Sequence, residues 1–375
     1  MDNITLIATA KFGLEKIVKN ELKALGYSQL AGGEGKVEFR ATWQDIPRTN
    51  LWLRCADRAL LKMGEFSALT FDELFEQTKA IPWEEVIPAD GRFPVSAKTV
   101  KSTLRSPRSC QAIVKKAVAA RLQAAYGVEW LAETAGTYAI QVSLLRDTAV
   151  LSIDTSGAGL HKRGYRAAAG EAPLKETLAA GLVRLSSWRP EQTLLDPLCG
   201  SGTILIEAAM IARNIAPGLN RSFAAEEWPV IGPQLWQEAR AAAKDAIDRN
   251  GRLQINGYDR DAAAIAIAQS NAAKAGVADD ITFERKELKD LWIDRQYGVL
   301  ISNPPYGRRL AGYREINDIY LTLNKIFRKK KGWAVYILTA DGMFPRYFKR
   351  ARPDRVRKLY NGKIRVNYYQ YHGER

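Results

Sequence analysis

The sequence predicts an α/β protein with a doubly wound sheet in its C-terminal half and smaller α+β units before it. From residue 172 onward, helical segments alternate with short apolar segments of strand length, the pattern of a mostly parallel sheet covered by helices. A glycine-rich turn at 199–203 joins one of these strands to a helix. At 375 residues the chain is also long for a single core, which predicts two or three domains.

Residues 1–66 and 67–160 are predicted to be two α+β units. The first alternates strands and helices, and its first helix ends at Gly26. The second has a helix that opens at Thr70, a strand, a long helix and a hairpin. The predicted elements are Ile4–Ala10, 14–25, Lys36–Thr42, Asp45–Ala56 and Ala59–Phe66 in the first unit, and Phe93–Val100, Gln111–Tyr126, Tyr138–Leu144 and Ala149–Asp154 in the second.

Residues 161–375 are predicted to form the doubly wound domain. Two of its helices are predicted at Leu174–Leu185 and Ala262–Ala275. The segment Ile215–Trp236 contains prolines and is predicted to be an inserted loop. The predicted buried strands are Thr193–Leu198, Leu253–Tyr258, Ile281–Lys286, Gly298–Ser302 and Trp333–Leu338.

The most informative motif is Asn303-Pro304-Pro305-Tyr306, which follows the apolar strand residues 299–301. Ligands bind beyond the carboxyl ends of strands in such sheets. Two adjacent prolines hold the chain extended, so the Pro304 carbonyl and the Asn303 side-chain oxygen can accept both hydrogens of a planar amino group. Tyr306 can then stack on the ring that carries the amine. The alternative is a proline-rich turn that only closes a strand.

A second motif runs from Asp196 through Cys199-Gly200-Ser201-Gly202 into a helix at Thr203. The two glycines can adopt positive φ and admit a ligand to the backbone, and the helix N-terminus offers free N–H groups. The motif lacks the Gly-Lys-Ser/Thr of a phosphate loop and the three glycines of the dinucleotide fingerprint. An Asp before the turn suits a cofactor with a positive amino group. A glycine pair alone could equally be a structural turn.

Together the two motifs resemble those of the amino-methylating class I S-adenosylmethionine methyltransferases. Three further segments resemble the entry to the catalytic domain in THUMP-containing RNA guanine methyltransferases: Ser156-Gly157, Leu160–Arg166 and Ala172–Ala180. The likeness is greatest to the RlmL-type large-subunit rRNA N(2)-guanine methyltransferases of bacteria, and it covers essentially the whole chain.

The resemblance implies a Rossmann-like class I methyltransferase domain at 161–375, preceded by a ferredoxin-like unit at 1–66 and a THUMP RNA-binding domain at 67–160. It implies S-adenosylmethionine as the cofactor, and 23S rRNA or an assembling large ribosomal subunit as the partner. Bifunctional members of the family carry a second methyltransferase after the first. This chain stops at Arg375, so no second activity is expected.

The resemblance also assigns cofactor-binding residues. Asp259 follows the next strand, where an acidic residue binds ribose hydroxyls, although it could instead cap the following helix. Glu287 stands where the family commonly has an Asp near the adenine amino group, and this departure leaves the contact open. Lys175 and Thr177 match the motif beside the methionine end, although an exposed first helical turn would explain them too. The turn itself contributes Asp196, Cys199, Gly200, Ser201, Gly202 and Thr203.

The predicted catalytic residues are Asn303, Pro304, Pro305 and Tyr306. Transfer to an amine needs no covalent intermediate, because the enzyme mainly has to align the acceptor nitrogen with an already activated methyl group. Cys199 is outside the motifs in which a cysteine attacks a pyrimidine ring, so we interpret it as a small residue that fills the turn.

A formal charge of +15 and a pI near 9.6 indicate a polyanionic partner, but charge alone does not separate RNA from DNA or anionic lipid. Basic residues cluster in 98–116, within the predicted THUMP unit, and again where the chain enters the catalytic domain. A solvated basic surface is the alternative interpretation. The predicted RNA-binding residues are Lys98, Lys101, Arg105, Arg108, Lys115, Lys162, Arg163 and Arg166.

The cysteines Cys55, Cys110 and Cys199 share no metal-ligand spacing, and His161 and His372 are the only histidines. Neither a metal site nor a disulfide framework is predicted. No apolar stretch reaches the length of a transmembrane helix, and the first residues do not form a signal peptide. A cytoplasmic location without a membrane partner is predicted, while the oligomeric state cannot be inferred.

The predicted function is methyl transfer to the N(2) exocyclic amine of a guanine in 23S rRNA. One alternative is a DNA or RNA adenine amino-methyltransferase, which shares the Asn-Pro-Pro-Tyr chemistry. A protein glutamine methyltransferase shares it too, but gains nothing from the positive charge. A non-catalytic RNA-binding assembly factor is the third alternative, and the intact motif residues Asp196, Gly200, Gly202 and Asn303 argue against it. The choice of guanine over adenine depends on the resemblance.

Overall fold

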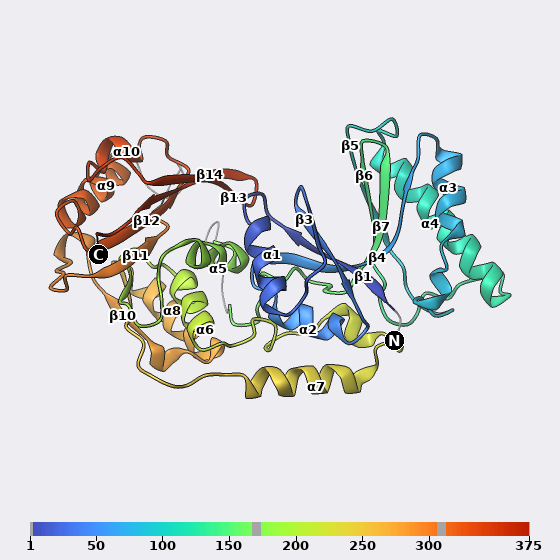
Figure 1. The fold of residues 1–375 in the computed structure, drawn as a ribbon, viewed down its shortest axis with the longest axis horizontal. Coiled ribbons are helices and arrows are strands. Elements are labelled where there is room, and N and C mark those ends of the chain that lie inside the picture. Colours follow the sequence, from blue (N-terminus) through green and yellow to red (C-terminus); the bar gives the residue numbers. More distant parts are fainter. Residues whose placement is uncertain (1–2, 167–173, 306–312, 375) are drawn as a thin grey trace.

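The computed structural model describes residues 3–166, 174–305 and 313–374. Figure 1 shows an elongated molecule with one sheet in the N-terminal part and a second sheet in the C-terminal part, while helix α7 lies at the lower edge, beneath α2. Each sheet has seven strands, in the order β2-β3-β1-β4-β7-β6-β5 and β10-β9-β8-β11-β12-β14-β13. Among the described residues, no helix is long and apolar enough to cross a membrane.

The first sheet is continuous across both N-terminal units because strand β4 belongs to both. This strand is 12 residues long, pairs with β1 through its first half and with β7 through its second half, and shifts register between Lys62 and Gly64. The sheet and its helices comprise β1 (Ile4–Ala10), α1 (Glu15–Ala24), β2 (Leu30–Gly33), β3 (Lys36–Ala41), α2 (Asp45–Trp52), β4 (Ala56–Ser67), α3 (Phe71–Ala80), β5 (Val95–Val100), α4 (Pro107–Tyr126), β6 (Ile140–Leu145) and β7 (Thr148–Asp154).

Local sequence signals determine where the two helices of the second unit begin. Thr70 and Glu73 form a capping box at the start of α3. Helix α4 begins four residues before the predicted Gln111, because the Ser106 side chain caps it and Pro107 occupies its first turn. The short strand β2 was not predicted, since its sequence, Leu-Ala-Gly-Gly, has no strand periodicity and only its pairing with β3 holds it extended.

The second sheet confirms the predicted doubly wound fold. Strands β10, β9, β8, β11 and β12 are parallel, and the antiparallel hairpin of β13 and β14 completes the edge. That hairpin was not predicted, because its many basic residues hide the alternation of apolar positions. The elements are α5 (Glu176–Leu185), β8 (Leu194–Asp196), α6 (Thr203–Ala212), α7 (Gly232–Asp245), β9 (Ile255–Asp259), α8 (Ala262–Ala275), β10 (Ile281–Arg285), β11 (Gly298–Ser302), α9 (Tyr313–Phe327), β12 (Trp333–Thr339), α10 (Phe344–Tyr347), β13 (Arg355–Asn361) and β14 (Ile364–Tyr371).

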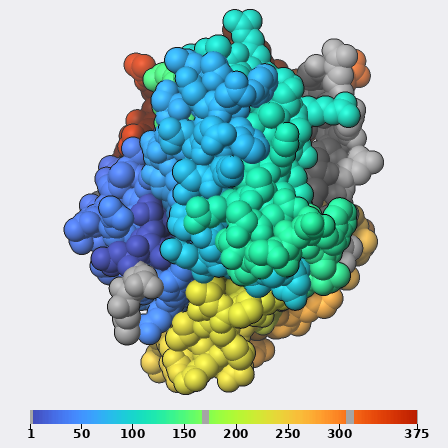
Figure 2. All heavy atoms as spheres, turned by 90° about the vertical axis from the view of Figure 1, so that its right-hand side faces the viewer, coloured from blue at the N-terminus to red at the C-terminus, as the bar shows by residue number. Residues whose placement is uncertain are grey.

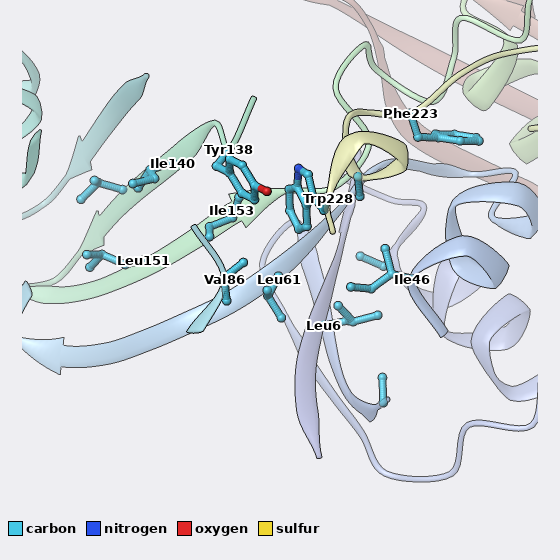
Figure 3. Close-up of a cluster of buried hydrophobic side chains, with 14 of the residues drawn as sticks. Leu6, Ile46, Leu61, Val86, Tyr138, Ile140, Leu151, Ile153, Phe223 and Trp228 are labelled. Carbon is cyan, nitrogen blue, oxygen red and sulfur yellow. The ribbon is translucent and has the colours of Figure 1, made fainter. Parts of the chain in front are cut away.

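The predicted insertion at Ile215–Trp236 is more than a loop, since it contains a short 3-10 helix (Ala224–Glu227) and the start of α7. Its Trp228 is 1% exposed and stacks on Tyr138, with ring centroids 4.9 Å apart and an interplanar angle of 17°. The Trp228 indole N–H donates to the Thr137 carbonyl at 3.1 Å. Figure 3 shows Trp228 and Tyr138 together with side chains of the N-terminal strands. The C-terminal domain therefore supplies part of the N-terminal core.

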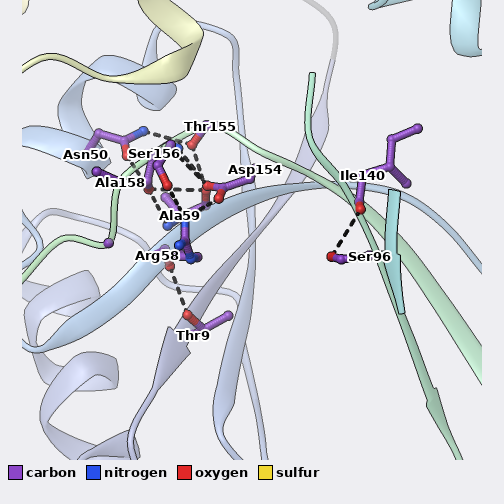
Figure 4. Close-up of polar contacts among 12 residues, drawn as sticks. Thr9, Asn50, Arg58, Ala59, Ser96, Ile140, Asp154, Thr155, Ser156 and Ala158 are labelled. Atoms are coloured by element: carbon purple, nitrogen blue, oxygen red, sulfur yellow. Dashed lines mark hydrogen bonds and ion pairs between the residues drawn. The ribbon is translucent and has the colours of Figure 1, made fainter. Parts of the chain in front are cut away.

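A buried polar network joins the end of β7 to the first unit (Figure 4). The Asn50 side chain donates to Thr155 Oγ1 at 2.9 Å and accepts from Ser156 Oγ at 2.6 Å. The Ala59 N–H donates to Ser156 Oγ at 2.9 Å, and Thr155 Oγ1 donates to the Ala59 carbonyl at 2.7 Å. Because these groups are buried and bonded to one another, they fix where the chain leaves the first sheet for the catalytic domain.

Candidate active site

The candidate site lies where the order of parallel strands reverses. The chain runs outward from β8 to β9 and β10, then returns to place β11 on the other side of β8. In doubly wound sheets this switch point is where ligands bind, outside the carboxyl ends of the strands. Asp196 ends β8, Ser302 ends β11 and Asn303 follows it directly, so the fold brings the two sequence motifs to one place.

The glycine turn is held open on one side and packed tightly on the other. Gly200 and Gly202 have φ values of +52° and +77°, which favour glycine. A Cβ on Gly202 would lie 2.7 Å from the Phe283 ring, so this glycine is also required by packing against β10. A Cβ on Gly200 would meet no atom within 4 Å among the described residues, so this side of the turn can accept a ligand.

Asp196 ties the ends of β8 and β11 together. It is 2% exposed, and its Oδ1 accepts hydrogen bonds from Ser302 Oγ at 2.7 Å and from the Leu198 N–H at 3.1 Å. Burial raises the pKa of this carboxyl group to about 7. Ser302 is a site residue that the sequence analysis missed. Its position immediately before Asn303 was the one feature that could have indicated a role in the site. That Asp196 binds the cofactor stays a prediction.

Asp259 links the glycine turn to the second strand. Its Oδ2 accepts from the Gly200 N–H at 2.9 Å, and its Oδ1 accepts from the Asp261 N–H at 3.0 Å. The cap of helix α8 is Asp261, whose side chain accepts from the Ala263 N–H at 2.8 Å. The alternative interpretation, in which Asp259 caps the helix, is therefore wrong. That Asp259 binds the ribose hydroxyls of the cofactor stays a prediction.

Asn303 presents a buried acceptor that the protein does not satisfy. Its Oδ1 is buried and has no hydrogen-bond partner among the described residues. Pro304, which is buried, and Pro305 follow it at the end of the strand. A buried carbonyl oxygen without a donor is destabilising by about 1–3 kcal/mol, so such an atom at a switch point fits a ligand that brings its own N–H group. Tyr306 lies outside the described residues.

The helix α5 begins beside this site. Lys175 precedes it and is partly buried, while Thr177 is 1% exposed. Thr177 Oγ1 has no hydrogen-bond partner in the described part of the chain. The alternative interpretation of Thr177 as part of an exposed helical turn is therefore wrong. Arg166 donates to both Glu176 and Thr203, so the start of α5 lies beside the glycine turn.

Two of the predicted cofactor-binding residues, Glu287 and Cys199, offer no unpaired buried group to a ligand among the described residues. Glu287 is exposed and lines a hollow of about 350 Å³ with Arg260, Arg285, Lys286 and Asp290. Cys199 is 8% exposed, and burial raises the pKa of its thiol far above the usual range. A thiol that stays protonated is a poor nucleophile, which agrees with the interpretation of Cys199 as a residue that fills the turn.

The predicted RNA-binding residues divide into two groups. Arg163 is 2% exposed, pairs with Glu207 and donates to the Leu160 carbonyl at 2.8 Å. Its guanidinium cannot reach a phosphate, so that prediction is corrected. Arg166 bonds to groups beside the glycine turn, and Lys115 bonds to Glu133 and the Phe93 carbonyl. The exposed members are Lys98, Lys101, Arg105, Arg108 and Lys162.

The fold and the site define a class I methyltransferase domain carried on an N-terminal α+β module. The family described as RMKL-like methyltransferase domain matches residues 163–370. The RlmL ferredoxin-like domain matches residues 5–60, and the THUMP domain matches residues 68–154. The chain therefore belongs to the RMKL-like methyltransferase family, as the sequence resemblance predicted. S-adenosylmethionine is the methyl donor of this family, which confirms the predicted cofactor.

Two curated relatives cover nearly the whole chain. The putative RNA methyltransferase YpsC of Bacillus subtilis is 46% identical over 373 residues, which are 99% of this chain and 96% of that protein. The ribosomal RNA large subunit methyltransferase K/L of Syntrophotalea carbinolica is 35% identical over 382 residues, which cover 96% of this chain. The match spans 52% of that second protein.

Two solved structures share the complete fold. SMU.472, described as a putative methyltransferase complexed with SAH, is 42% identical with a TM-score of 0.93, and the match covers 100% of this chain and 99% of that one. A protein from Listeria monocytogenes, described as a predicted N6-adenine-specific DNA methylase, is 47% identical with a TM-score of 0.95, and the match covers 100% and 97% of the two chains.

Proposed function

We propose that this protein transfers a methyl group to the N(2) amine of a guanine in large-subunit rRNA. The observation that carries the proposal is the buried Oδ1 of Asn303 at the switch point of the sheet, which has no hydrogen-bond partner among the described residues. An exocyclic amine that donates to this oxygen would satisfy it and would be held at the carboxyl ends of β8 and β11. S-adenosylmethionine, when bound, supplies the activated methyl group.

The neighbouring residues keep the Asn303 oxygen in place. Ser302 precedes Asn303 and is tied to Asp196, so the end of β11 is fixed against β8. Pro304 has no N–H group of its own, and its carbonyl is the second acceptor proposed for the amine. A paired guanine uses its amine within the duplex, so the target base has to be unpaired or extruded before it can donate to Asn303.

The proposed RNA contact is the basic part of the THUMP domain. Lys101 and Arg105 line a hollow of about 480 Å³ together with Thr99, Ser102, Thr103 and Asp147, whose carboxylate accepts from the Thr103 N–H. Cations beside hydroxyl groups suit the phosphate oxygens of a nucleic-acid backbone. This hollow belongs to the THUMP end of the molecule, which Figure 2 views from the side of helices α3 and α4. The names of the Bacillus and Syntrophotalea relatives support RNA, and specifically rRNA, as the substrate.

The second candidate is transfer to the N6 amine of adenine. Asn303 Oδ1 accepts from either exocyclic amine, and the description of the Listeria protein names an adenine in DNA. Guanine is favoured by the combination of the RlmL-type ferredoxin-like domain and the THUMP domain in one chain. The two candidates differ in the product nucleoside, which can be measured directly.

The test is methyl transfer from labelled S-adenosylmethionine to RNA from cells that lack this protein, followed by nuclease digestion and nucleoside mass spectrometry. N(2)-methylguanosine in large-subunit rRNA is the expected product. Labelled methyladenosine, or label in DNA or protein, would overturn the proposed substrate. Binding of S-adenosylhomocysteine without transfer to any RNA would instead favour a non-catalytic role.

The role of Asn303 is tested by a matched pair of variants. Asn303→Ala removes the acceptor and is expected to lower kcat by about 100-fold or more while S-adenosylhomocysteine still binds. Asn303→Asp keeps an acceptor oxygen at the same position and is expected to retain more activity than Asn303→Ala. Near-normal turnover by Asn303→Ala would remove this residue from the catalytic role.

A further inference from the structure

The hairpin of β13 and β14 extends past the edge of the sheet at which the candidate site lies. Strand β14 runs antiparallel to β12, and Asn367 pairs with Thr339, the last residue of β12. Residues 360–365, the hairpin tip, therefore lie beyond the carboxyl ends of the parallel strands. Asn303 follows β11, the neighbour of β12, at the same edge. Because β11 and β14 are two strand spacings, about 10 Å, apart, the hairpin tip stands beside the candidate site.

Two aromatic side chains from distant parts of the chain meet at the hairpin tip. Phe12, in the turn between β1 and α1, contacts Tyr360 edge to face, with ring centroids 6.0 Å apart and an interplanar angle of 85°. Gly13 allows this approach, since a Cβ at its position would lie 2.8 Å from the Leu359 side chain. Figure 1 shows the hairpin reaching from the C-terminal sheet to the N-terminal unit. Phe12 is 61% exposed and Tyr360 36%, so both rings keep free surface on which a planar group can stack.

Exposed cations accompany this aromatic pair. Tyr360 lies directly opposite Arg365 in the pairing of β13 with β14, so their side chains share one face of the hairpin. Lys358 precedes Tyr360 by two residues and lies on the same face. Both cations are exposed, as is Lys363 in the turn. Residues 355–371 include five Lys or Arg and no Asp or Glu, so no carboxylate within the hairpin offsets this charge. Exposed rings beside positive charge suit a polyanion that carries aromatic bases.

We propose that the hairpin tip, together with Phe12 and Lys358, binds the unpaired RNA nucleotides that adjoin the target base. The proposal rests on the proposed function, because the occupant is the RNA substrate. Proteins that hold single-stranded nucleic acid stack its bases on aromatic rings and bind its phosphates with cations, and the hairpin tip offers both. A target base that is unpaired or extruded leaves its neighbours in the strand free to stack on protein rings.

This contact is separate from the hollow of the THUMP domain. The hollow follows β5, the outer strand of the first sheet, whereas the hairpin tip lies at the edge of the second sheet where Asn303 is found. Phe12 belongs to the ferredoxin-like unit, so the proposal gives this unit a direct contact with the substrate. The RNA is then held at two places, one in the THUMP domain and one beside the candidate site.

The experiment separates stacking from charge by measuring fluorescence anisotropy of a labelled single-stranded RNA of about 12 nucleotides over a range of salt concentrations. Tyr360→Ala and Phe12→Ala in the full chain are each expected to weaken binding by about tenfold without changing the slope of log affinity against log salt, because stacking releases no counterions. Replacing Lys358 and Arg365 together with Gln is expected to reduce that slope by about 0.7 for each lost phosphate contact. The matched control is Tyr297→Ala, which removes a 61% exposed tyrosine just before β11, at the opposite edge of the sheet, and is expected to change neither quantity.

A pair of milder variants distinguishes stacking from a structural role of Tyr360. Tyr360→Trp keeps a ring and is expected to bind the single strand within about twofold of wild type. Tyr360→Leu keeps an apolar contact with Phe12 but loses the ring, and is expected to bind as weakly as Tyr360→Ala. Full affinity in Tyr360→Leu would show that the residue only holds the hairpin against the N-terminal unit. S-adenosylhomocysteine is expected to bind all of these variants as it binds wild type, which would show that the catalytic domain is folded.

Three further outcomes would overturn the proposal. Single-strand affinity that is unchanged in both Tyr360→Ala and Phe12→Ala would place the flanking nucleotides elsewhere. An equal loss for a duplex of the same sequence, whose bases are already stacked on one another, would exclude base stacking as the contact. Variants that bind naked RNA normally but methylate ribosomal particles more slowly would assign the surface to a protein partner. If wild-type protein transferred no methyl group to RNA, the proposed function itself would fail, whereas an active wild type with unaffected variants would refute only this contact.

Discussion

The basic residues of 98–108 and the arginines Arg163 and Arg166 look alike in sequence but lie in opposite environments. Lys98, Lys101 and Arg105 are exposed at the THUMP end of the molecule. Arg163 and Arg166 are instead bonded to carboxylates and carbonyl groups inside the catalytic domain. The comparison teaches that a run of positive charge predicts RNA binding only where the charges remain free, because a buried cation is already neutralised by its protein partners.

The largest effect, a loss of stability, is expected when the buried Arg163 is replaced. Arg163→Met would leave Glu207, which is 0% exposed, without its cation. We expect a loss of about 3–5 kcal/mol in the free energy of unfolding, because an uncompensated charge would remain in the interior. Lys98→Met is expected to change it by less than about 0.5 kcal/mol. Urea unfolding measures both values.

A double variant separates charge from packing at Arg163. Adding Glu207→Gln to Arg163→Met removes the unpaired carboxylate and is expected to restore part of the lost stability. A stability of Arg163→Met within about 1 kcal/mol of wild type would show that the buried pair contributes little. In that case, the distinction between the two basic segments would rest on exposure alone.

A pH effect extends the comparison to buried and exposed acids. Burial raises the pKa of Asp196 from 3.8 to about 7, so the folded chain keeps a proton that the unfolded chain releases between these values. The stability from this group is full below about pH 4 and is lost as the pH rises through 7, by up to about 4 kcal/mol. Asp196→Asn should remove this slope in cofactor-free protein, and the exposed control Asp72→Asn should keep it.

The outcome for Asp196 is read from urea unfolding at pH 5 and pH 8. A slope that survives unchanged in Asp196→Asn would assign the pH dependence to other groups. Loss of the slope in both variants would show that the comparison between buried and exposed acids does not hold.

The exposed basic segment is expected to act through salt-dependent binding. Replacing Lys98, Lys101 and Arg105 together with Gln should weaken RNA binding and reduce the slope of log affinity against log salt by about 0.7–0.9 for each lost phosphate contact. The matched control replaces three exposed cations elsewhere, Lys23, Lys244 and Arg252. An unchanged slope in the first variant would place the RNA on another surface.

The smallest effect is expected at Lys115, which lies in the wider basic stretch 98–116 but is already bonded to protein groups. Its Nζ lies 3.5 Å from the centroid of the Phe93 ring and pairs with Glu133. Lys115→Met should reduce RNA affinity less than Lys101→Met and should change stability by about 1 kcal/mol or less. Filter-binding measurements at one salt concentration compare the two variants, and an equal loss would contradict the distinction.

The sequence was sufficient for features that depend on local pattern. Alternating strands and helices predicted the doubly wound sheet, and the motifs at Asp196–Thr203 and Asn303–Pro305 are brought to one switch point. Strand β2 and the β13–β14 hairpin were missed, because pairing with neighbouring strands rather than their own periodicity holds them. The packing of Trp228 against Tyr138 could not be predicted, since it joins residues far apart in the chain.

By itself, the sequence predicted the family and the cofactor through its resemblance to known methyltransferases, and the order and spacing of residues determined the fold class and the position of the two motifs. The tertiary structure alone decided which polar groups are satisfied. It buried Arg163 against Glu207, left Asn303 Oδ1, Thr177 Oγ1 and Arg166 Nη1 unpaired among the described residues, and kept Lys101 in solvent. The physical reason is that the free energy of a charge or hydrogen-bonding group depends on its partners and burial, which distant segments supply.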